Sequence, residues 1–263
     1  TVNPSLEFDL QRIRFQFEDS RPDRVIISHA SNVIGLIAPV EEIFRMAKEY
    51  GSTTVLDMAQ SAGLVDCDLS KDFFDFAVFA GHKTLLGPTG ISGFVMKPEI
   101  DLEPVFFGGT GFESANQEMP RSLPERFEFG TLNAVGIAGL NASTKWILEQ
   151  GIDAIAKKEE ENRARLVDLL DTYDFISIVG NVSGQRYVGI VSCVIQDISS
   201  DTAGQLFRER NIAVRTGLHC APLAHLFLKT YPAGTIRFSV NCFTSPEDFL
   251  ELEAALDDIA DNL

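Results

Sequence analysis

Residues 54–90 read TVLDMAQSAGLVDCDLSKDFFDFAVFAGHKTLLGPTG. This stretch contains two short apolar runs of strand length, and polar side chains follow each run at once. Asp57 and Gln60 come at the end of the first run, and His82 and Lys83 come after the second. In open α/β sheets, ligands bind outside the carboxyl ends of the strands. The stretch therefore predicts neighbouring strands that bring these four side chains to one edge of a sheet.

The chain on both sides of this stretch alternates strands with helices. Continuous apolar runs predict strands at residues 24–28, 53–56, 75–79 and 91–96. Pro39 is suited to the first position of a helix, and Gly51 ends that helix. Strands that are apolar on both faces and alternate with helices indicate a mostly parallel sheet. Asn32, which follows the first strand, joins the predicted site edge.

The sequence changes character after Gly151. Residues 152–170 predict a charged amphipathic helix whose charges face solvent. Further strands and helices follow at 176–179, 188–194, 200–209, 213–215, 235–240 and from Pro246. Before this change, the Gly- and Pro-rich residues 107–130 predict a long loop. We therefore expect a large domain over 1–150 and a smaller α+β domain over 151–263.

Composition narrows the classes of partner. Of the 263 residues, 45% are hydrophobic, and the net charge of −16 disfavours binding to nucleic acid. The sequence contains no run of about 18 apolar residues, so no membrane-spanning helix is expected. The N-terminus lacks the pattern of a signal peptide. The four cysteines form no CxxC pair, so neither zinc nor disulfides are expected. We therefore expect a cytoplasmic protein whose cysteines are reduced. Its 20 phenylalanines are expected to fill the interior.

Asp57 and Lys83 together suit a site for pyridoxal 5′-phosphate (PLP). A lysine amine forms a Schiff base with a carbonyl when partial desolvation lowers its pKa. A carboxylate against a pyridine nitrogen keeps that nitrogen protonated, which lets the ring accept electrons. Gln60 could reach the ring hydroxyl, and His82 the phosphate. Taken singly, each has a plainer interpretation, such as an exposed lysine or an aspartate that caps a turn.

Cys220 is the cysteine most suited to act as a nucleophile. It lies in a Gly-bearing loop beside His219 and five residues after Arg215. A nearby cation favours the thiolate form of a cysteine, which is the reactive form. The other three cysteines lie in apolar or acidic surroundings and are expected to be structural, and they are Cys67, Cys193 and Cys242.

The ordered set of motifs extends beyond the central stretch. It comprises SHASNVIGLIAPVEEI, VLDMAQSAG, FAGHKTLLGPTGISG, FGGTG, MPRSLPERFEFGTLNAVGIAGL, VRTGLHCAPLAH and GTIRFSVNCFTSPEDF. In this order the chain resembles the class V aminotransferase group of PLP enzymes, and within it the cysteine desulfurases and selenocysteine lyases. The resemblance implies the α/β PLP-dependent transferase fold of type I, with the cofactor bound in the large domain.

The resemblance also implies roles for single residues. Lys83 forms the Schiff base with PLP, Asp57 faces the pyridinium nitrogen, and Gln60 faces the ring oxygen. Asn32 lies near that oxygen and near the substrate carboxylate. His82 contacts the phosphate. Lys83 and His82 count as catalytic residues as well as cofactor-binding ones.

The implied reaction converts L-cysteine to L-alanine and leaves a persulfide on Cys220. Arg237, with Arg215 beside it, binds the substrate α-carboxylate through its two-pronged guanidinium. Thr131 reaches the phosphate of a neighbouring subunit, so a homodimer is implied. The persulfide sulfur passes to an acceptor protein, as in sulfur mobilisation for iron–sulfur cluster assembly.

One part of the family pattern has no counterpart here. Family members carry an earlier segment with a phosphate-binding loop and a histidine that stacks on the cofactor ring. The chain is thus expected to be a truncated form that holds PLP weakly or not at all, since such a loop donates several hydrogen bonds of about 1.5–3 kcal/mol each. The alternatives are another class V aminotransferase, a selenocysteine lyase or an inactive scaffold. Motifs do not distinguish sulfur from selenium, and they do not identify the acceptor.

Overall fold

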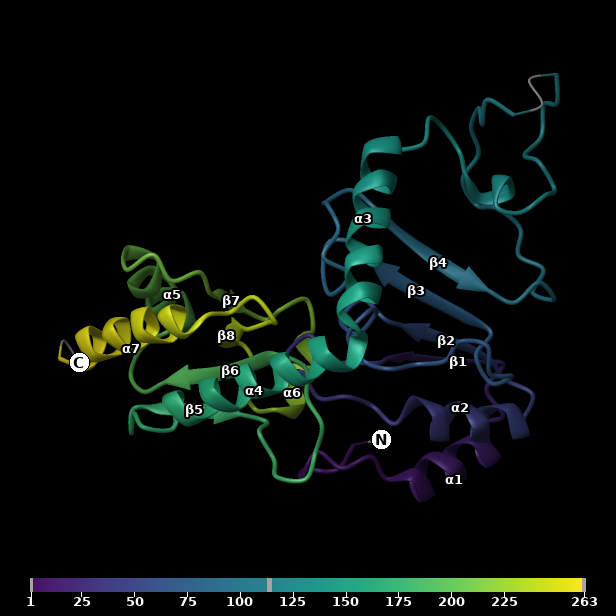
Figure 1. The fold of residues 1–263 in the computed structure, drawn as a ribbon. Coiled ribbons are helices and arrows are strands. Elements are labelled where there is room, and N and C mark those ends of the chain that lie inside the picture. Colours follow the sequence, from purple (N-terminus) through teal and green to yellow (C-terminus); the bar gives the residue numbers. More distant parts are fainter. Residues whose placement is uncertain (1, 113–114, 262–263) are drawn as a thin grey trace.

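The computed structural model describes residues 2–112 and 115–261. Figure 1 shows two sheets side by side, each with its own helices. The first half of the chain supplies one sheet and the second half supplies the other. The α/β class expected from the sequence is confirmed.

The first sheet contains β1 (Arg24–Ser28), β2 (Thr53–Asp57), β3 (Phe76–Ala80) and β4 (Ser92–Met96), in that order. The first three strands are parallel, and β4 runs antiparallel to β3. Each of the four predicted strands is confirmed to within a residue at either end. Ser28 pairs with Asp57, and Asp57 with Val78. This register brings the carboxyl ends of the parallel strands to one edge.

Helices α1 (Leu10–Ser20) and α2 (Val40–Glu49) lie beside this sheet, and α3 (Ala134–Gln150) leads toward the second one (Figure 1). Acidic residues in the first turn of α2 and Lys48 in its last turn complement the helix dipole. Phe44 of α2 is fully buried with Leu56 and Phe74 in one apolar cluster. Burial of this one face fixes α2 against the sheet.

Between β4 and α3 the chain has little regular structure, as predicted for 107–130. Among the described residues of this segment, the 3₁₀ turn η1 (Glu125–Phe127) is a short regular element. Residues 113 and 114 of the predicted loop lie outside the described residues.

The second sheet contains β5 (Ile176–Val179), β6 (Ile190–Ile195), β8 (Thr235–Ser239) and β7 (Arg215–Gly217), in that spatial order. Every neighbouring pair is antiparallel. Helices α4 (Ile152–Leu170), α5 (Ser200–Glu209) and α7 (Pro246–Ala260) accompany it. The predicted strand at 213–215 begins two residues later, and the short helix α6 (Pro222–Phe227) has no counterpart in the prediction. A division into domains at 151 stays a prediction.

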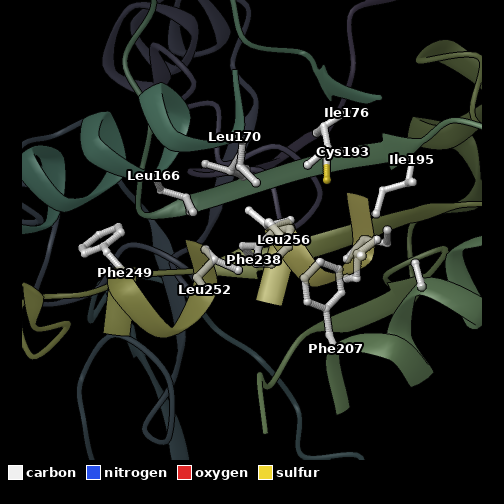
Figure 2. Packing of buried hydrophobic residues seen from close by; sticks show 14 residues of the cluster. Leu166, Leu170, Ile176, Cys193, Ile195, Phe207, Phe238, Phe249, Leu252 and Leu256 are labelled. Atoms are coloured by element: carbon white, nitrogen blue, oxygen red, sulfur yellow. The ribbon is translucent and has the colours of Figure 1, made fainter. Parts of the chain in front are cut away.

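The core of the second half lies between the sheet and its helices (Figure 2). Leu166 and Leu170 of α4 meet Leu256 of α7 there. The rings of Phe207 and Phe238 pack edge to face, with centroids 5.2 Å apart. Cys193 is fully buried in the same cluster, as expected of a structural cysteine.

A further cluster joins the two halves of the chain. It brings Leu64 and Val65 of the first half against Ile155 of α4 and Ile190 of β6. The long helices α3 and α4 meet at Gly151, whose φ of 85° lies in the left-handed region that favours glycine. The contact holds the two sheets in one arrangement, so residues from both can share a site.

The expectation that phenylalanine fills the interior is wrong for much of the chain. Large parts of several rings are exposed, namely Phe15, Phe94, Phe106, Phe107, Phe112, Phe129 and Phe243. Most of them lie on β4 or in the irregular segment after it. Separately, no helix in the described part of the chain is both long and apolar enough to cross a bilayer.

Phe207→Ala tests the second core. Phe207 is 0% exposed, so we expect the substitution to lower the free energy of unfolding by about 3–5 kcal/mol, through lost burial and the cavity left behind. Urea denaturation followed by circular dichroism measures the change. Phe15, which is 67% exposed, supplies the control, and Phe15→Ala should change stability by less than about 0.5 kcal/mol. Equal effects of the two substitutions would contradict the packing described.

Candidate functional site

The strand-end side chains meet at the predicted edge of the first sheet. Asp57 is the last residue of β2, and its carboxylate accepts hydrogen bonds from Ser28 Oγ (3.0 Å) and from the backbone N–H of Ala59 (2.9 Å). These bonds fix the orientation of the carboxylate. Asp57 lines a cavity of about 600 Å³, together with Lys83 and Cys220.

A second cavity, of about 380 Å³, adjoins the first. We call the first the Asp57 cavity and the second the Arg237 cavity. Asn32, Gln60 and Lys83 line both of them. The Lys83 side chain therefore stands where the two cavities meet, within reach of a ligand that extends from one into the other.

Asn32 links the two halves of the chain. Its Oδ1 accepts hydrogen bonds from Gln60 Nε2 and from Arg237 Nη1 (2.8 Å). Its Nδ2 donates to the carbonyl of His219 (2.9 Å), and its own carbonyl accepts a second bond from Arg237 Nη1 (2.9 Å). The one amide thus positions groups from the first sheet, from β8 and from the loop that carries Cys220.

Two arginines face each other across β7 and β8. Arg215 and Arg237 are directly paired in the register of these strands, and like charges in that position repel. Burial lowers the pKa of Arg237, and the charge of Arg215 lowers it further. Arg237 Nε is buried without a hydrogen-bond partner among the described residues. A carboxylate bound here would relieve the repulsion and satisfy the free donor.

Cys220 differs from the other three cysteines in its surroundings. Its side chain is exposed, and its sulfur accepts a hydrogen bond from Arg215 Nη2 at 3.3 Å. Burial raises the pKa of the Cys67 thiol to about 11 and that of Cys193 to about 12, and it also raises the pKa of Cys242. Thiols with such raised pKa values are protonated at neutral pH and poorly nucleophilic.

Two predicted site residues lie apart from this network. His82 is exposed, although it lines the Arg237 cavity next to Lys83. Thr131 is exposed just before α3 and is not among the described residues that line either cavity. Its predicted contact is to a second subunit, so its role stays a prediction.

Glu159 of α4 lines the Arg237 cavity and was not predicted there. The charges of this helix were expected to face solvent, which is wrong for Glu159 because it is only 8% exposed. Its carboxylate accepts a bond from the backbone N–H of Gly189 at 2.7 Å. Its spacing from Ile155 and Leu166 places it on the apolar face of the helix, a signal that the charge pattern obscured.

The residues present fit the ring portion of PLP. The Asp57 cavity has the volume of an ordinary site for a small ligand. Along its wall lie an oriented carboxylate (Asp57), an amide donor (Gln60) and an amine (Lys83). These are the groups that a pyridinium nitrogen, a ring oxygen and an aldehyde require.

A family model described as "Aminotransferase class-V" matches residues 1–252. Among curated proteins, the chain is 35% identical over 243 residues to a probable cysteine desulfurase of Pyrococcus abyssi, covering 91% of this chain and 60% of the relative. It is also 35% identical over 254 residues to one of Aeropyrum pernix, covering 92% and 61%. The chain thus spans about 60% of the length of these relatives.

Solved structures give the same picture. The apo structure of a cysteine desulfurase from Thermococcus onnurineus NA1 superposes with a TM-score of 0.91 at 29% identity, covering 100% of this chain and 66% of that one. A cysteine desulfurase from Escherichia coli, at 24% identity, shares the fold with a TM-score of 0.86, over 100% and 65% of the two chains.

Glu159 should make stability depend on pH. Burial raises its pKa from about 4.5 to about 7, although the Gly189 N–H opposes the shift. Its stabilising contribution is therefore present below about pH 4.5 and is lost as the pH rises through about 7. Glu159→Gln removes that loss, so its stability relative to the unaltered protein should rise by about 1–3 kcal/mol between about pH 5 and pH 8.

Urea denaturation at the two pH values measures this difference. Glu160→Gln is the matched control, because Glu160 is the exposed neighbour on the same helix. It should leave the pH dependence as it is. If Glu159→Gln also leaves it as it is, the carboxyl does not titrate in this range.

Proposed function

The chain belongs to the aminotransferase class V family, and from this premise we propose that it forms the catalytic part of a PLP-dependent cysteine desulfurase. The substrate would be L-cysteine, and the products would be L-alanine and a persulfide on Cys220. The observation that carries this proposal is the contact between Arg215 Nη2 and Cys220 Sγ, two residues that line the adjoining cavities where Lys83 and Asp57 also lie.

The cofactor would be held by residues around the Asp57 cavity. When bound, PLP supplies an electron sink that stabilises negative charge on the α-carbon of an amino acid. Asp57 would hold a proton at the pyridine nitrogen, and Gln60, which also bonds to Asn32, would face the ring oxygen. Lys83 would attach the cofactor through Nζ and, once free, would move protons at the substrate. His82 would contact the phosphate.

The arginine pair would orient the substrate. Arg237 already donates to Asn32 through Nη1, so its position is set before any ligand arrives. Its unpaired Nε and the nearby charge of Arg215 fit an α-carboxylate. A carboxylate held there leaves the side chain of a short amino acid free to point toward Cys220, which follows Arg215 by five residues.

Cys220 would then take the sulfur. The thiolate attacks the substrate sulfur, and a new S–S bond forms. The C–S bond breaks with its electron pair left on the β-carbon, which takes up a proton. The balance is one thiol and one cysteine giving one persulfide and one alanine, and no external oxidant or reductant is needed.

The contact between the Cys220 thiol and Arg215 also helps to choose among the activities of class V enzymes. A plain aminotransferase has no step that needs a nucleophilic sulfur, so the Arg215–Cys220 contact favours desulfuration. Two alternatives remain: a selenocysteine lyase would use the same cofactor site, and an inactive scaffold would have the same fold. The relatives named as probable cysteine desulfurases point the same way.

The proposal extends to the domain arrangement, the oligomeric state and the sulfur acceptor. A cofactor domain at 1–150 and a small domain at 151–263 would close around the site. Thr131 would serve a second subunit of a homodimer. A sulfur-acceptor protein of the cytoplasm would collect the persulfide, and iron–sulfur cluster assembly would be one destination.

Titration of the full chain with PLP tests the cofactor site. We expect bound PLP to give a visible absorption band near about 420 nm, the range of a protonated Schiff base with lysine. Lys83→Ala should remove the band, because its amine makes the covalent bond. Lys97→Ala should keep it, since Lys97 lies beyond β4 and bonds to Asp72. A protein that stays colourless at high PLP would overturn the cofactor assignment.

Cys220→Ser tests the nucleophile. Alanine release from L-cysteine, measured by chromatography in the presence of a reducing thiol, should fall by at least about 100-fold. The PLP absorption band should remain, which separates loss of the nucleophile from loss of the cofactor. Cys67→Ser, a half-buried thiol outside both cavities, is the control and should release alanine at the original rate. Full activity in Cys220→Ser would refute desulfuration through this thiol.

A further inference from the structure

His219 precedes Cys220 and is almost completely enclosed. It is 2% exposed, whereas Cys220 is exposed. Its ring Nε2 forms a hydrogen bond with Thr235 Oγ1 at 2.8 Å, and Thr235 is itself fully buried. Its carbonyl accepts the bond from Asn32 Nδ2. The residue next to the reactive thiol is therefore held at its side chain and at its backbone.

The backbone at this point is in an unfavourable conformation. His219 has a φ of 48° and Cys220 a φ of 60°. Residues with side chains rarely adopt this left-handed region, and two in succession are rarer still. Such conformations persist where surrounding contacts over-determine them. The Cys220 side chain is exposed and its sulfur accepts a hydrogen bond from Arg215, while the Ala221 N–H closes the turn on the Leu218 carbonyl at 2.8 Å. His219 ties this turn to the rest of the site through its ring and its carbonyl.

The anchor ends on the strand that carries the arginine clamp. Thr235 opens β8, two residues before Arg237 on the same strand. Thr235 pairs with Gly217 of β7, and Arg237 pairs with Arg215. The bond from His219 to Thr235 thus ties the loop that follows β7 to the start of β8. It sets the Cys220 backbone relative to the two strands that carry the arginines.

We propose that His219 is a positioning residue, whose hydrogen bond to Thr235 holds the Cys220 sulfur beside Arg215 and at the arginine pair. The part that this plays in sulfur transfer rests on the proposed function. The placement of the sulfur does not, because the contacts belong to the chain itself.

The charge state of His219 agrees with a purely positional role. Burial lowers its pKa to about 4, and the charges of Arg237, His225 and Arg215 lower it further. At neutral pH the ring is uncharged, so Arg215 supplies the positive charge beside the sulfur. A hydroxyl partner can pair with either tautomer of the ring, so Thr235 holds the neutral form.

Two alkylating reagents measure where the sulfur lies. Iodoacetate carries a carboxylate and iodoacetamide does not, so a cysteine beside two arginines should favour iodoacetate. The readout is the ratio of the two rates at Cys220, followed by peptide mass spectrometry in the full chain. Thr235→Val removes the hydroxyl at nearly constant shape, and we expect the ratio to fall by about fivefold, as a charge contact in solvent predicts. Thr235→Ser keeps the hydroxyl and should keep the ratio.

A second histidine–threonine pair supplies the matched control. His225 Nδ1 bonds to Thr230 Oγ1 at 2.7 Å in the adjacent helix and turn. Thr230→Val removes an equivalent hydrogen bond that does not anchor the Cys220 backbone, and it should leave the ratio unchanged. Arg215→Gln gives the low limit of the ratio. His219→Leu should match Thr235→Val, which keeps the test valid if one of the two variants fails to fold.

The inference is overturned if Thr235→Val and His219→Leu keep the original ratio, or if Thr230→Val lowers it equally, since either result makes the bond a general support. It is also overturned if the unaltered protein shows the low ratio of Arg215→Gln. Alkylation needs neither PLP nor turnover. A protein without desulfurase activity that gives the expected ratios would therefore refute the proposed function and leave the positioning role intact.

Discussion

The bonds from Arg237 to Asn32 are the interaction on which the site depends. One guanidinium nitrogen of β8 bonds to both oxygens of an asparagine that follows β1. These residues are 205 positions apart, since Arg237 lies in the second sheet and Asn32 lies in the turn that follows β1 of the first. Because Asn32 also binds Gln60 and the carbonyl of His219, the wall of the Asp57 cavity and the loop that carries Cys220 are positioned against a common group. Misplacement of either sheet would separate them.

Much of the first sheet follows from sequence because its signals are local. Apolar runs end at Ser28, Asp57 and Ala80, and parallel pairing then brings Asn32, Asp57 and Lys83 to one edge. The structure brings Arg237 and Cys220 to this edge as well. From the sequence, that meeting was implied by resemblance alone, since no local pattern reports a contact between residues so distant along the chain.

Two residues of the site were not predicted, because the sequence around each of them suggests a different environment from the one in the structure. Glu159 lies in a run of charges, KKEEENR, that is typical of a solvated helix face, yet helical spacing places it in the core with Asn162. His219 has the local sequence of an ordinary loop histidine, and its buried hydrogen bond is made to Thr235 on a later strand. In both cases the decisive partner is a group outside the local segment, namely the Gly189 N–H and the Thr235 hydroxyl.

The charge of the whole chain bears on what the site can accept. A net charge of −16 repels anions at long range, whereas Arg215, Arg237 and Lys83 line the Arg237 cavity. A ligand with net negative charge is therefore slowed on approach and attracted only at contact. A free amino acid is a zwitterion without net charge, so it escapes the repulsion and still offers a carboxylate to the arginines. The acidic chain and the cations that line the Arg237 cavity thus agree with the zwitterionic amino acid of the proposed function.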